Sequence, residues 1–160
     1  MVKIRLVCVG QLKGKFWQAA FNEYKKRLGA FCSFELIEVD EHKIKNDPSS
    51  AEIAQCLERE GEKIFSKIPG KSYVIALCIE GDGLSSPRFA KHLENIFTNQ
   101  TGEISLIIGS SFGLAQSVKD RADFLLSMSS MTFPHQLARV MLCEQIYRAF
   151  GIMGDSKYHK

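Results

Sequence analysis

A regular alternation of apolar runs and amphipathic stretches restricts the fold of this sequence more than any other feature. The apolar runs are rich in Val, Ile and Leu, and the stretches between them carry apolar residues at helical spacing, as in Phe16, Ala20, Tyr24 and Leu28. Strands are expected over residues 2–9, 34–39, 73–79, 103–108 and 124–127, and helices are expected to begin near residues 15, 50, 87, 115 and 134. Strands that alternate with helices indicate an α/β fold, a parallel sheet with helices on both faces.

Short local motifs predict where some of these elements begin and end. Ser49 followed by Glu52 predicts a capping box at the start of the second helix. Ser86 followed by Pro87 predicts the N-cap and the first helical position of the third helix. The Gly-Asp-Gly sequence at 81–83 is expected to break the third strand, which is the most apolar one.

Length and composition predict one globular domain over residues 1–160, since 45% of the residues are hydrophobic and 24% are charged. No apolar stretch approaches the about 20 residues of a membrane span, and Lys3 and Arg5 interrupt the N-terminal apolar run, so neither a span nor a signal peptide is expected. The five cysteines are odd in number and form no CxxC motif, which argues against a zinc site and favours a reduced, cytoplasmic protein. The formal charge of +3 and pI of about 8.6 permit an RNA partner.

Parallel sheets bind ligands beyond the carboxyl ends of their strands, so functional residues are expected after Leu77, Ile108 and Ser127. The segment after Ile108 carries Gly109 and Gly113, and amides in such a turn can cradle an anion or a nucleotide-like ligand. Neither GxGxxG nor a Walker A motif is present. An ordinary turn between a strand and a helix is the alternative interpretation.

The loop at 126–136 combines small hydroxyl side chains with thioether and aromatic surface, which suits a ligand made of adenine and ribose. The alternative is a Ser/Thr-rich loop that caps the last helix. His135 lies in the first turn of that helix, where its protonated form is disfavoured, and a structural role is the more common one for a lone histidine. Arg139 lies one turn later, with a solvated arginine as its alternative, and Glu144 and Arg148 are spaced to form an ion pair.

Several segments together resemble the RlmH family, the small SPOUT-class methyltransferases of bacterial large-subunit ribosomal RNA. The segments are Ile-Ile-Gly-Ser-Ser-Phe-Gly-Leu at 107–114, Leu-Ser-Met-Ser-Ser-Met-Thr-Phe-Pro-His-Gln at 126–136, the helix at 139–150, and Tyr158-His159-Lys160 at the end of the chain. The resemblance covers essentially the whole chain. The chain departs from the family at one point, because it has Gly109-Ser110 where the family usually has a Gly-Gly pair.

The resemblance implies a single SPOUT domain with a C-terminal trefoil knot, a homodimer, and S-adenosylmethionine as the methyl donor. It also implies N3-methylation of the pseudouridine at position 1915, in helix 69 of 23S rRNA, on the assembled 70S ribosome. No metal and no membrane are implied.

Site residues can be carried over by position. Cofactor contacts are implied at Leu77, at Gly109 and along the loop of Met128, Ser129, Ser130, Met131, Thr132 and Phe133. His159, from the tail of the opposite subunit, is the first candidate for contact with the base, and Tyr158 could stack on it. Arg139 and Lys160 could hold a phosphate or stabilise a developing anion.

Other interpretations remain open at this stage. The basic side chains that could contact rRNA phosphates could equally form a solvated face; they are Lys13, Lys15, Lys25, Lys26, Arg27, Lys43 and Lys45. A flavodoxin-like module would share the alternating pattern, and so would a receiver, although the acidic cluster of a receiver is missing. A non-catalytic ribosome-binding or assembly protein of the same fold is the remaining alternative.

Overall fold

The computed structural model describes residues 1–154. It contains one five-stranded sheet in the order β2-β1-β4-β3-β5, and every pair of neighbouring strands is parallel. The strands are β1 (Lys3–Val9), β2 (Ser33–Val39), β3 (Tyr73–Gly83), β4 (Glu103–Ile108) and β5 (Phe124–Ser127). The helices are α1 (Lys15–Leu28), α2 (Ser50–Phe65), α3 (Ser86–Asn99), α4 (Gln116–Arg121) and α5 (His135–Met153). The predicted α/β fold with helices on both faces of a parallel sheet is confirmed.

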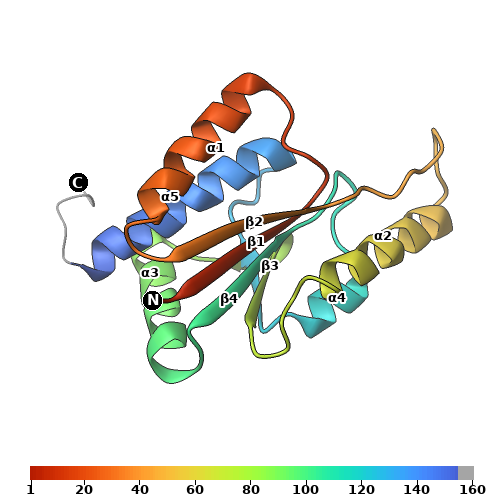
Figure 1. Cartoon of the computed structure of the whole chain (residues 1–160). Coiled ribbons are helices and arrows are strands. Elements are labelled where there is room, and N and C mark those ends of the chain that lie inside the picture. The colour runs from red at the N-terminus through yellow and green to blue at the C-terminus, as the bar shows by residue number, and fades with distance from the viewer. Residues whose placement is uncertain (155–160) are drawn as a thin grey trace.

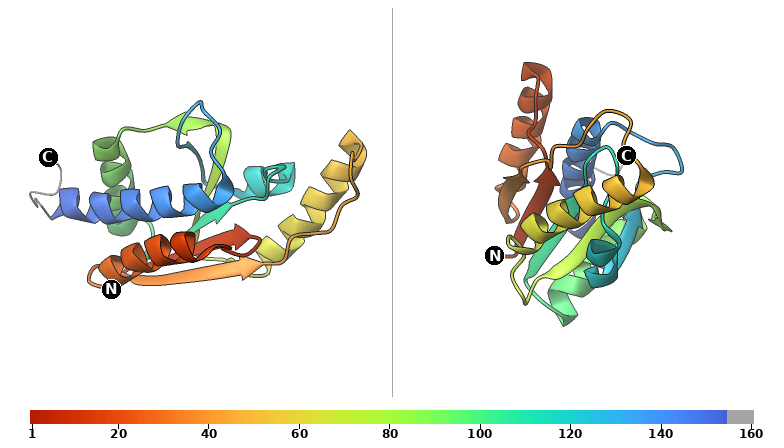
Figure 2. Two further views of the ribbon diagram at one scale, coloured as in Figure 1. Left: turned by 90° about the horizontal axis from the view of Figure 1, so that it is seen from above. Right: turned by 90° about the vertical axis from the view of Figure 1, so that its right-hand side faces the viewer.

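The helices form two unequal layers. Helix α5 lies between α1 and α3 on one face of the sheet, and α2 and α4 cover the other face (Figures 1 and 2). The larger apolar core joins the first layer to the sheet and the smaller core joins the second. Strands β1 and β4 lie in the middle and are buried along almost their whole length, as expected for central strands of a parallel sheet.

The predicted capping box of α2 is present. The Ser49 hydroxyl accepts a hydrogen bond from the Glu52 amide at 3.2 Å, and the Glu52 carboxylate accepts one from the Ser49 amide at 3.4 Å. The predicted start of α3 is wrong by one residue, because Ser85 is the N-cap and accepts from the Arg88 amide. Ser86 lies inside the helix, where its hydroxyl donates to Gln145 of α5 at 2.6 Å.

The prediction that 81–83 ends the third strand is also wrong. Strand β3 continues to Gly83, and its pairing with β5 shifts register between Leu77 and Asp82. The irregular segment passes very close to β5: a Cβ atom at Gly81 would lie 2.7 Å from the backbone of Leu125. Glycine here permits close approach of two backbones at a bulge, so the strand bends and continues. As a result of the bend, residues 78–80 lie near the carboxyl ends of the neighbouring strands.

Among residues 1–154, none of the helices combines the length and the apolar character that a membrane crossing requires.

Candidate functional site

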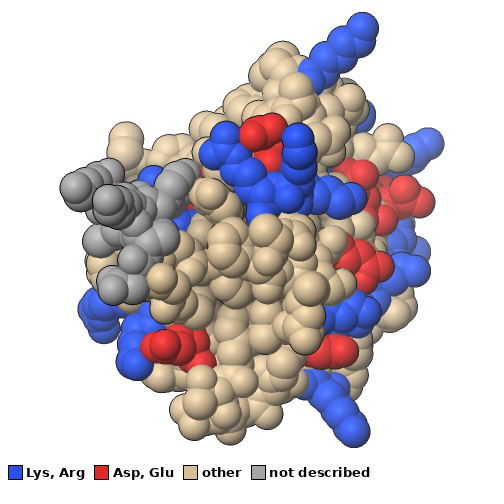
Figure 3. All heavy atoms as spheres, turned by 60° about the vertical axis from the view of Figure 1, so that its left-hand side comes forward, with Lys and Arg blue, Asp and Glu red and all other residues tan. Residues whose placement is uncertain are grey.

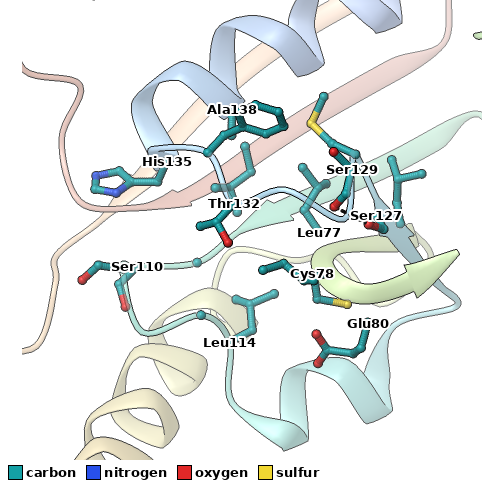
Figure 4. A pocket seen from close by; sticks show the side chains of 18 of the residues that line it. Leu77, Cys78, Glu80, Ser110, Leu114, Ser127, Ser129, Thr132, His135 and Ala138 are labelled. Atoms are coloured by element: carbon teal, nitrogen blue, oxygen red, sulfur yellow. Dashed lines mark hydrogen bonds between the residues drawn. The ribbon is translucent and has the colours of Figure 1, made fainter. Parts of the chain in front are cut away.

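A cavity of about 630 Å³ opens at the carboxyl end of the sheet. Three segments surround it: residues 77–80 of β3, the turn 108–114 after β4, and the loop around 126–135 before α5 (Figure 4). Lys119 of α4 and Ala138 of α5 complete the lining. The expectation that ligands bind beyond the carboxyl ends of the strands, called the strand-end rule below, therefore predicts the correct edge of the sheet. The volume of the cavity lies within the range of small-molecule sites.

The turn after β4 is closed tightly by two glycines. Gly113 has a φ of +92°, which L side chains rarely adopt, and its amide donates to the Ser110 carbonyl at 2.9 Å. Gly109 has no room for a side chain, because a Cβ atom there would lie 2.2 Å from the Gly113 carbonyl oxygen. Ser110 fits into this turn in place of the usual second glycine, and its side chain is buried. The turn therefore brings backbone atoms at Gly109 and Gly113 to the wall of the cavity, together with the side chain of Phe112.

The loop before α5 is shaped by its own hydroxyl groups. The Ser127 hydroxyl donates to the Ser129 carbonyl, and the Met131 amide donates to the Ser129 hydroxyl, both at 3.0 Å. Met131 is 71% exposed at the rim, which leaves a large thioether side chain beside the opening. All of the expected cofactor residues line the cavity except Ser130, which belongs to the same loop; the lining ones are Leu77, Gly109, Met128, Ser129, Met131, Thr132 and Phe133.

The wall of the cavity is mostly apolar, with one charged pair at its edge. Glu80, within the register-shifted segment of β3, forms an ion pair with Lys119 of α4 (Figure 4 labels Glu80). The hydrogen bond from Lys119 lowers the pKa of the Glu80 carboxyl, which is therefore charged at neutral pH. The cavity thus presents apolar and thioether surface, hydroxyl groups, free backbone groups, and both signs of charge.

His135 begins α5 and lines the cavity, as expected for a residue in the first turn. Burial lowers the pKa of its imidazole, and the nearby positive charge of Arg139 lowers it further. The expected direction is confirmed, although burial and Arg139 are its causes rather than the helix start alone. The imidazole is therefore neutral at pH 7.

Arg139 lies in the interior of the protein. Its side chain is fully buried, and its guanidinium donates to Glu38 of β2 at 2.7 Å, to the Gly10 carbonyl at 2.7 Å and to the Val9 carbonyl at 3.3 Å. The solvated alternative is therefore wrong. Because none of its surface is exposed, contact with a phosphate would require the side chain to abandon these partners. In this arrangement Arg139 fastens the start of α5 to the carboxyl ends of β1 and β2.

The expected pair of Glu144 and Arg148 is present at 2.7 Å. Tyr158, His159 and Lys160 lie outside the described residues, so their roles stay predictions. Within residues 1–154, no group of three His, Cys, Asp or Glu side chains is arranged to hold a metal ion.

Sequence reasoning missed several lining residues. Cys78, Ile79 and Glu80 follow Leu77 directly, and the strand-end rule could have included them. Phe112 belongs to the segment 107–114 that was expected to bind a ligand, although it was not named among the contacts. Lys119 gave no usable signal, because only the folding of α4 brings it to the cavity. Glu38, the partner of Arg139, is separated from it by 101 residues and could not be paired with it from spacing.

Comparisons with known proteins agree with this geometry. Residues 2–159 match a family described as predicted SPOUT methyltransferase. The chain is 45% identical over 159 residues to ribosomal RNA large subunit methyltransferase H 1 of Clostridium perfringens, covering 99% of this chain and 100% of that protein. It is 46% identical, with the same coverage, to ribosomal RNA large subunit methyltransferase H of Streptococcus thermophilus.

Solved structures show the same fold at low sequence identity. A probable methylase family protein from Haemophilus influenzae superposes with a TM-score of 0.59 at 14% identity, covering 98% of this chain and 70% of that one. The tRNA (m1G37) methyltransferase of Aquifex aeolicus gives a TM-score of 0.52 at 13% identity, covering 91% and 69%. Taken with the whole-chain family match and the relatives, these likenesses show that the chain belongs to the SPOUT methyltransferases and, among them, to the ribosomal RNA large subunit methyltransferase H (RlmH) family.

Proposed function

We propose that this protein is an S-adenosylmethionine-dependent methyltransferase of ribosomal RNA. Its substrate is N3 of the pseudouridine at position 1915, in helix 69 of 23S rRNA, on the assembled 70S ribosome in the cytoplasm. The observation that carries the proposal is the cavity at the carboxyl edge of the sheet, where the Gly109 turn and the loop of Met128 to Phe133 face each other. The relatives' names support the choice of an rRNA substrate.

S-adenosylmethionine fits the chemistry of this cavity. Its adenine needs apolar surface and backbone hydrogen bonds, which Leu77, Phe133 and the Gly109 turn can provide. Its ribose needs hydroxyl partners, which Ser129 and Thr132 can provide. The cavity volume of about 630 Å³ leaves room for the whole molecule.

The ion pair at the edge of the cavity suits the amino-acid end of the same molecule. That end carries an ammonium and a carboxylate, so Glu80 offers the opposite charge to the first and Lys119 to the second. Replacing the ion pair between Glu80 and Lys119 by one ion pair from each side chain to the cofactor costs little free energy, because both side chains already lie at the partly solvent-exposed rim of the cavity.

When bound, the cofactor supplies a methyl group on a positively charged sulfur, already activated for displacement. The protein must hold N3 of the base in line with that methyl group and receive the N3 proton. Positioning can contribute about 7–11 kcal/mol, and a general base typically adds a factor of about 10²–10⁴. We assign contact with the base to His159 and Tyr158, and an anion-stabilising role to Lys160. Arg139 serves by fixing the start of α5 beside the loop, and the neutral His135 lines the cavity there.

A homodimer completes the site in this proposal, because the tail of one subunit reaches the cavity of the other. The side of the molecule that carries α1, α3 and α5 has a broad area without charged side chains (Figure 3). A groove of about 460 Å³ opens there, with Leu84, Val140 and Met141 in its wall. This groove supports a second copy as its occupant, and the proposal also includes the C-terminal trefoil knot that the family resemblance implies.

Recognition of the ribosome rests on basic side chains. Lys25, Lys26 and Arg27 gather in the last turn of α1. Arg27 also forms an ion pair with Glu23 at 2.8 Å, and Lys45 forms one with Glu52 at 3.1 Å. Arg27 and Lys45 therefore bind an RNA phosphate more weakly than their charge alone suggests. With about five phosphate contacts, the logarithm of affinity should fall with log salt at a slope near −0.7 to −0.9 per contact.

Transfer of labelled methyl from S-adenosylmethionine to unmodified 70S ribosomes tests this proposal, with free 23S rRNA and a chain lacking residues 158–160 in parallel. We expect label only on ribosomes, mapped to the helix 69 pseudouridine, and no transfer by the shortened chain, which should still bind the cofactor. Label on free rRNA alone would overturn the ribosome requirement. Cofactor binding without label on either RNA would exclude this substrate. The non-catalytic alternative would gain support if the full chain bound ribosomes and bound no cofactor.

A further inference from the structure

Beneath the wall of the cavity lies a buried acid, Glu60 of α2, which the proposed reaction does not use. Glu60 is 2% exposed. Its Oε1 accepts a hydrogen bond from the Cys56 thiol at 3.3 Å, and within residues 1–154 its Oε2 has no hydrogen-bond partner. Burial is the main cause that raises the pKa of this carboxyl, and the Cys56 thiol and the Ser110 hydroxyl act against that shift.

A second unpaired polar atom lies in the turn above it. Ser110 is 7% exposed, and its buried hydroxyl has no hydrogen-bond partner in the part of the chain that the structure describes. The Ser110 hydroxyl is close enough to Glu60 to lower the pKa of that carboxyl, although the two groups do not reach ordinary hydrogen-bond geometry. The backbone of Ser110 holds the turn closed through its hydrogen bond from Gly113.

The packing of α2 explains why these two groups meet. Gly61, next to Glu60, lies so close to α4 that a Cβ atom there would be 3.2 Å from Val118 and 3.6 Å from Ala115. Ala115 follows the Gly109–Gly113 turn directly, so this contact fixes α2 against the base of the turn. A small movement of the turn toward α2 would therefore be enough to join the two groups.

Two buried polar atoms without partners are costly, and native proteins rarely keep them without a reason. One hydrogen bond, donated by the Ser110 hydroxyl to Oε2 of Glu60, would satisfy both atoms at once. Its formation would fix the turn whose backbone lines the cavity.

We propose that Glu60 is a positioning residue, which acts through the Ser110 hydroxyl to set the Gly109–Gly113 turn when S-adenosylmethionine enters the cavity. This inference rests on the proposed cofactor site. It adds a residue from the opposite side of the sheet, outside the three segments that line the cavity, to the determinants of cofactor affinity.

Titration calorimetry with S-adenosylmethionine tests the coupling, using the wild type, Ser110→Ala, Glu60→Leu, Glu60→Gln and the double variant Ser110→Ala/Glu60→Leu. We expect each of Ser110→Ala and Glu60→Leu to weaken affinity about threefold to tenfold, the worth of one hydrogen bond. The double variant should be no weaker than the worse single one. Glu60→Gln should retain affinity within about twofold, because its side-chain carbonyl oxygen can accept from the same hydroxyl. Glu62→Leu, an exposed change on the same helix, is the matched control and should change nothing.

Fully additive losses, or an unchanged affinity in Ser110→Ala, would overturn the inference while leaving the cofactor site intact. No binding by the wild type would overturn both. Infrared difference spectra on cofactor addition provide a second test that does not depend on the folding of Glu60→Leu. The wild type should show a shifted carboxylate band that is absent in Glu60→Gln and diminished in Ser110→Ala. An identical band in Ser110→Ala would contradict the proposed contact.

Discussion

Replacing Arg139 by Met removes the guanidinium that joins three separate segments, while it keeps a long side chain of similar volume. In the wild type this group satisfies the Val9 and Gly10 carbonyls and the Glu38 carboxylate. After the change both carbonyls lose this donor, and Glu38 keeps its hydrogen bond from the Leu12 amide at 2.7 Å. Breaking a buried ion pair by removing one partner costs about 3–5 kcal/mol. For a chain of this size each kcal/mol lowers Tm by about 2–4 °C, so we expect a fall of about 6–20 °C.

Thermal unfolding followed by circular dichroism measures this effect. Lys91→Met is the matched control, since Lys91 lies on the surface and pairs only with Glu94 one turn away, an interaction worth at most about 0.5 kcal/mol. A Tm of Arg139→Met within about 2 °C of the wild type, together with lost methyl transfer, would refute the structural role. That result would instead place Arg139 in contact with the substrate.

Three further outcomes are expected. Gly109→Ala should weaken S-adenosylmethionine binding at least about tenfold in calorimetry, because its Cβ would lie 2.2 Å from a backbone oxygen. Gly102→Ala should leave the affinity unchanged, because a Cβ atom at Gly102 has open space around it. Equal effects of the two changes would argue against a tight turn at Gly109. Burial lowers the pKa of His92 below its ordinary 6.5, so the unfolded chain binds its proton more readily and stability should fall as pH drops below about 6.5. His92→Phe should show a smaller drop in urea midpoint between pH 7 and 5, and an unchanged drop would remove His92 as the cause. Cys78 lines the cavity, so bound cofactor should slow the alkylation of its thiol at pH 8. Cys8, whose pKa burial raises to about 12, should stay unmodified in the folded protein with or without cofactor. If the cofactor did not protect Cys78, the cofactor would have to bind elsewhere.

Local patterns in the sequence were sufficient to predict most elements. The strands over 103–108 and 124–127 and the helix over 15–28 coincide with β4, β5 and α1. Their apolar periodicity reports directly on which side of each element is buried. The capping box at Ser49 is equally local, because both of its hydrogen bonds lie within four residues.

Features that depend on distant contacts could not be predicted in the same way. The sequence around Gly81 predicts a strand end rather than a bulge, because glycine is typical of both, and only the contact with β5 decides between them. Nothing in the sequence places β4 between β1 and β3, since that order depends on how two separate crossovers pack. The partners of Arg139 also come from other elements, so its burial could not be predicted from the sequence.

Two separate lines of reasoning from the sequence predict the candidate site. The strand-end rule indicated the edge after Leu77, Ile108 and Ser127, and the family resemblance supplied the individual loop residues. The rim pair of Glu80 and Lys119 emerged only from the structure, because 39 residues separate the two side chains.

A crystal structure with S-adenosylhomocysteine, the demethylated product, tests the central claim most directly. The account predicts the adenine between the Gly109 turn and the loop of Met128 to Phe133, with the amino-acid end toward Lys119 and Glu80. A ligand seated instead in the groove lined by Val140 and Met141, or one that leaves the carboxyl edge of the sheet empty, would contradict it.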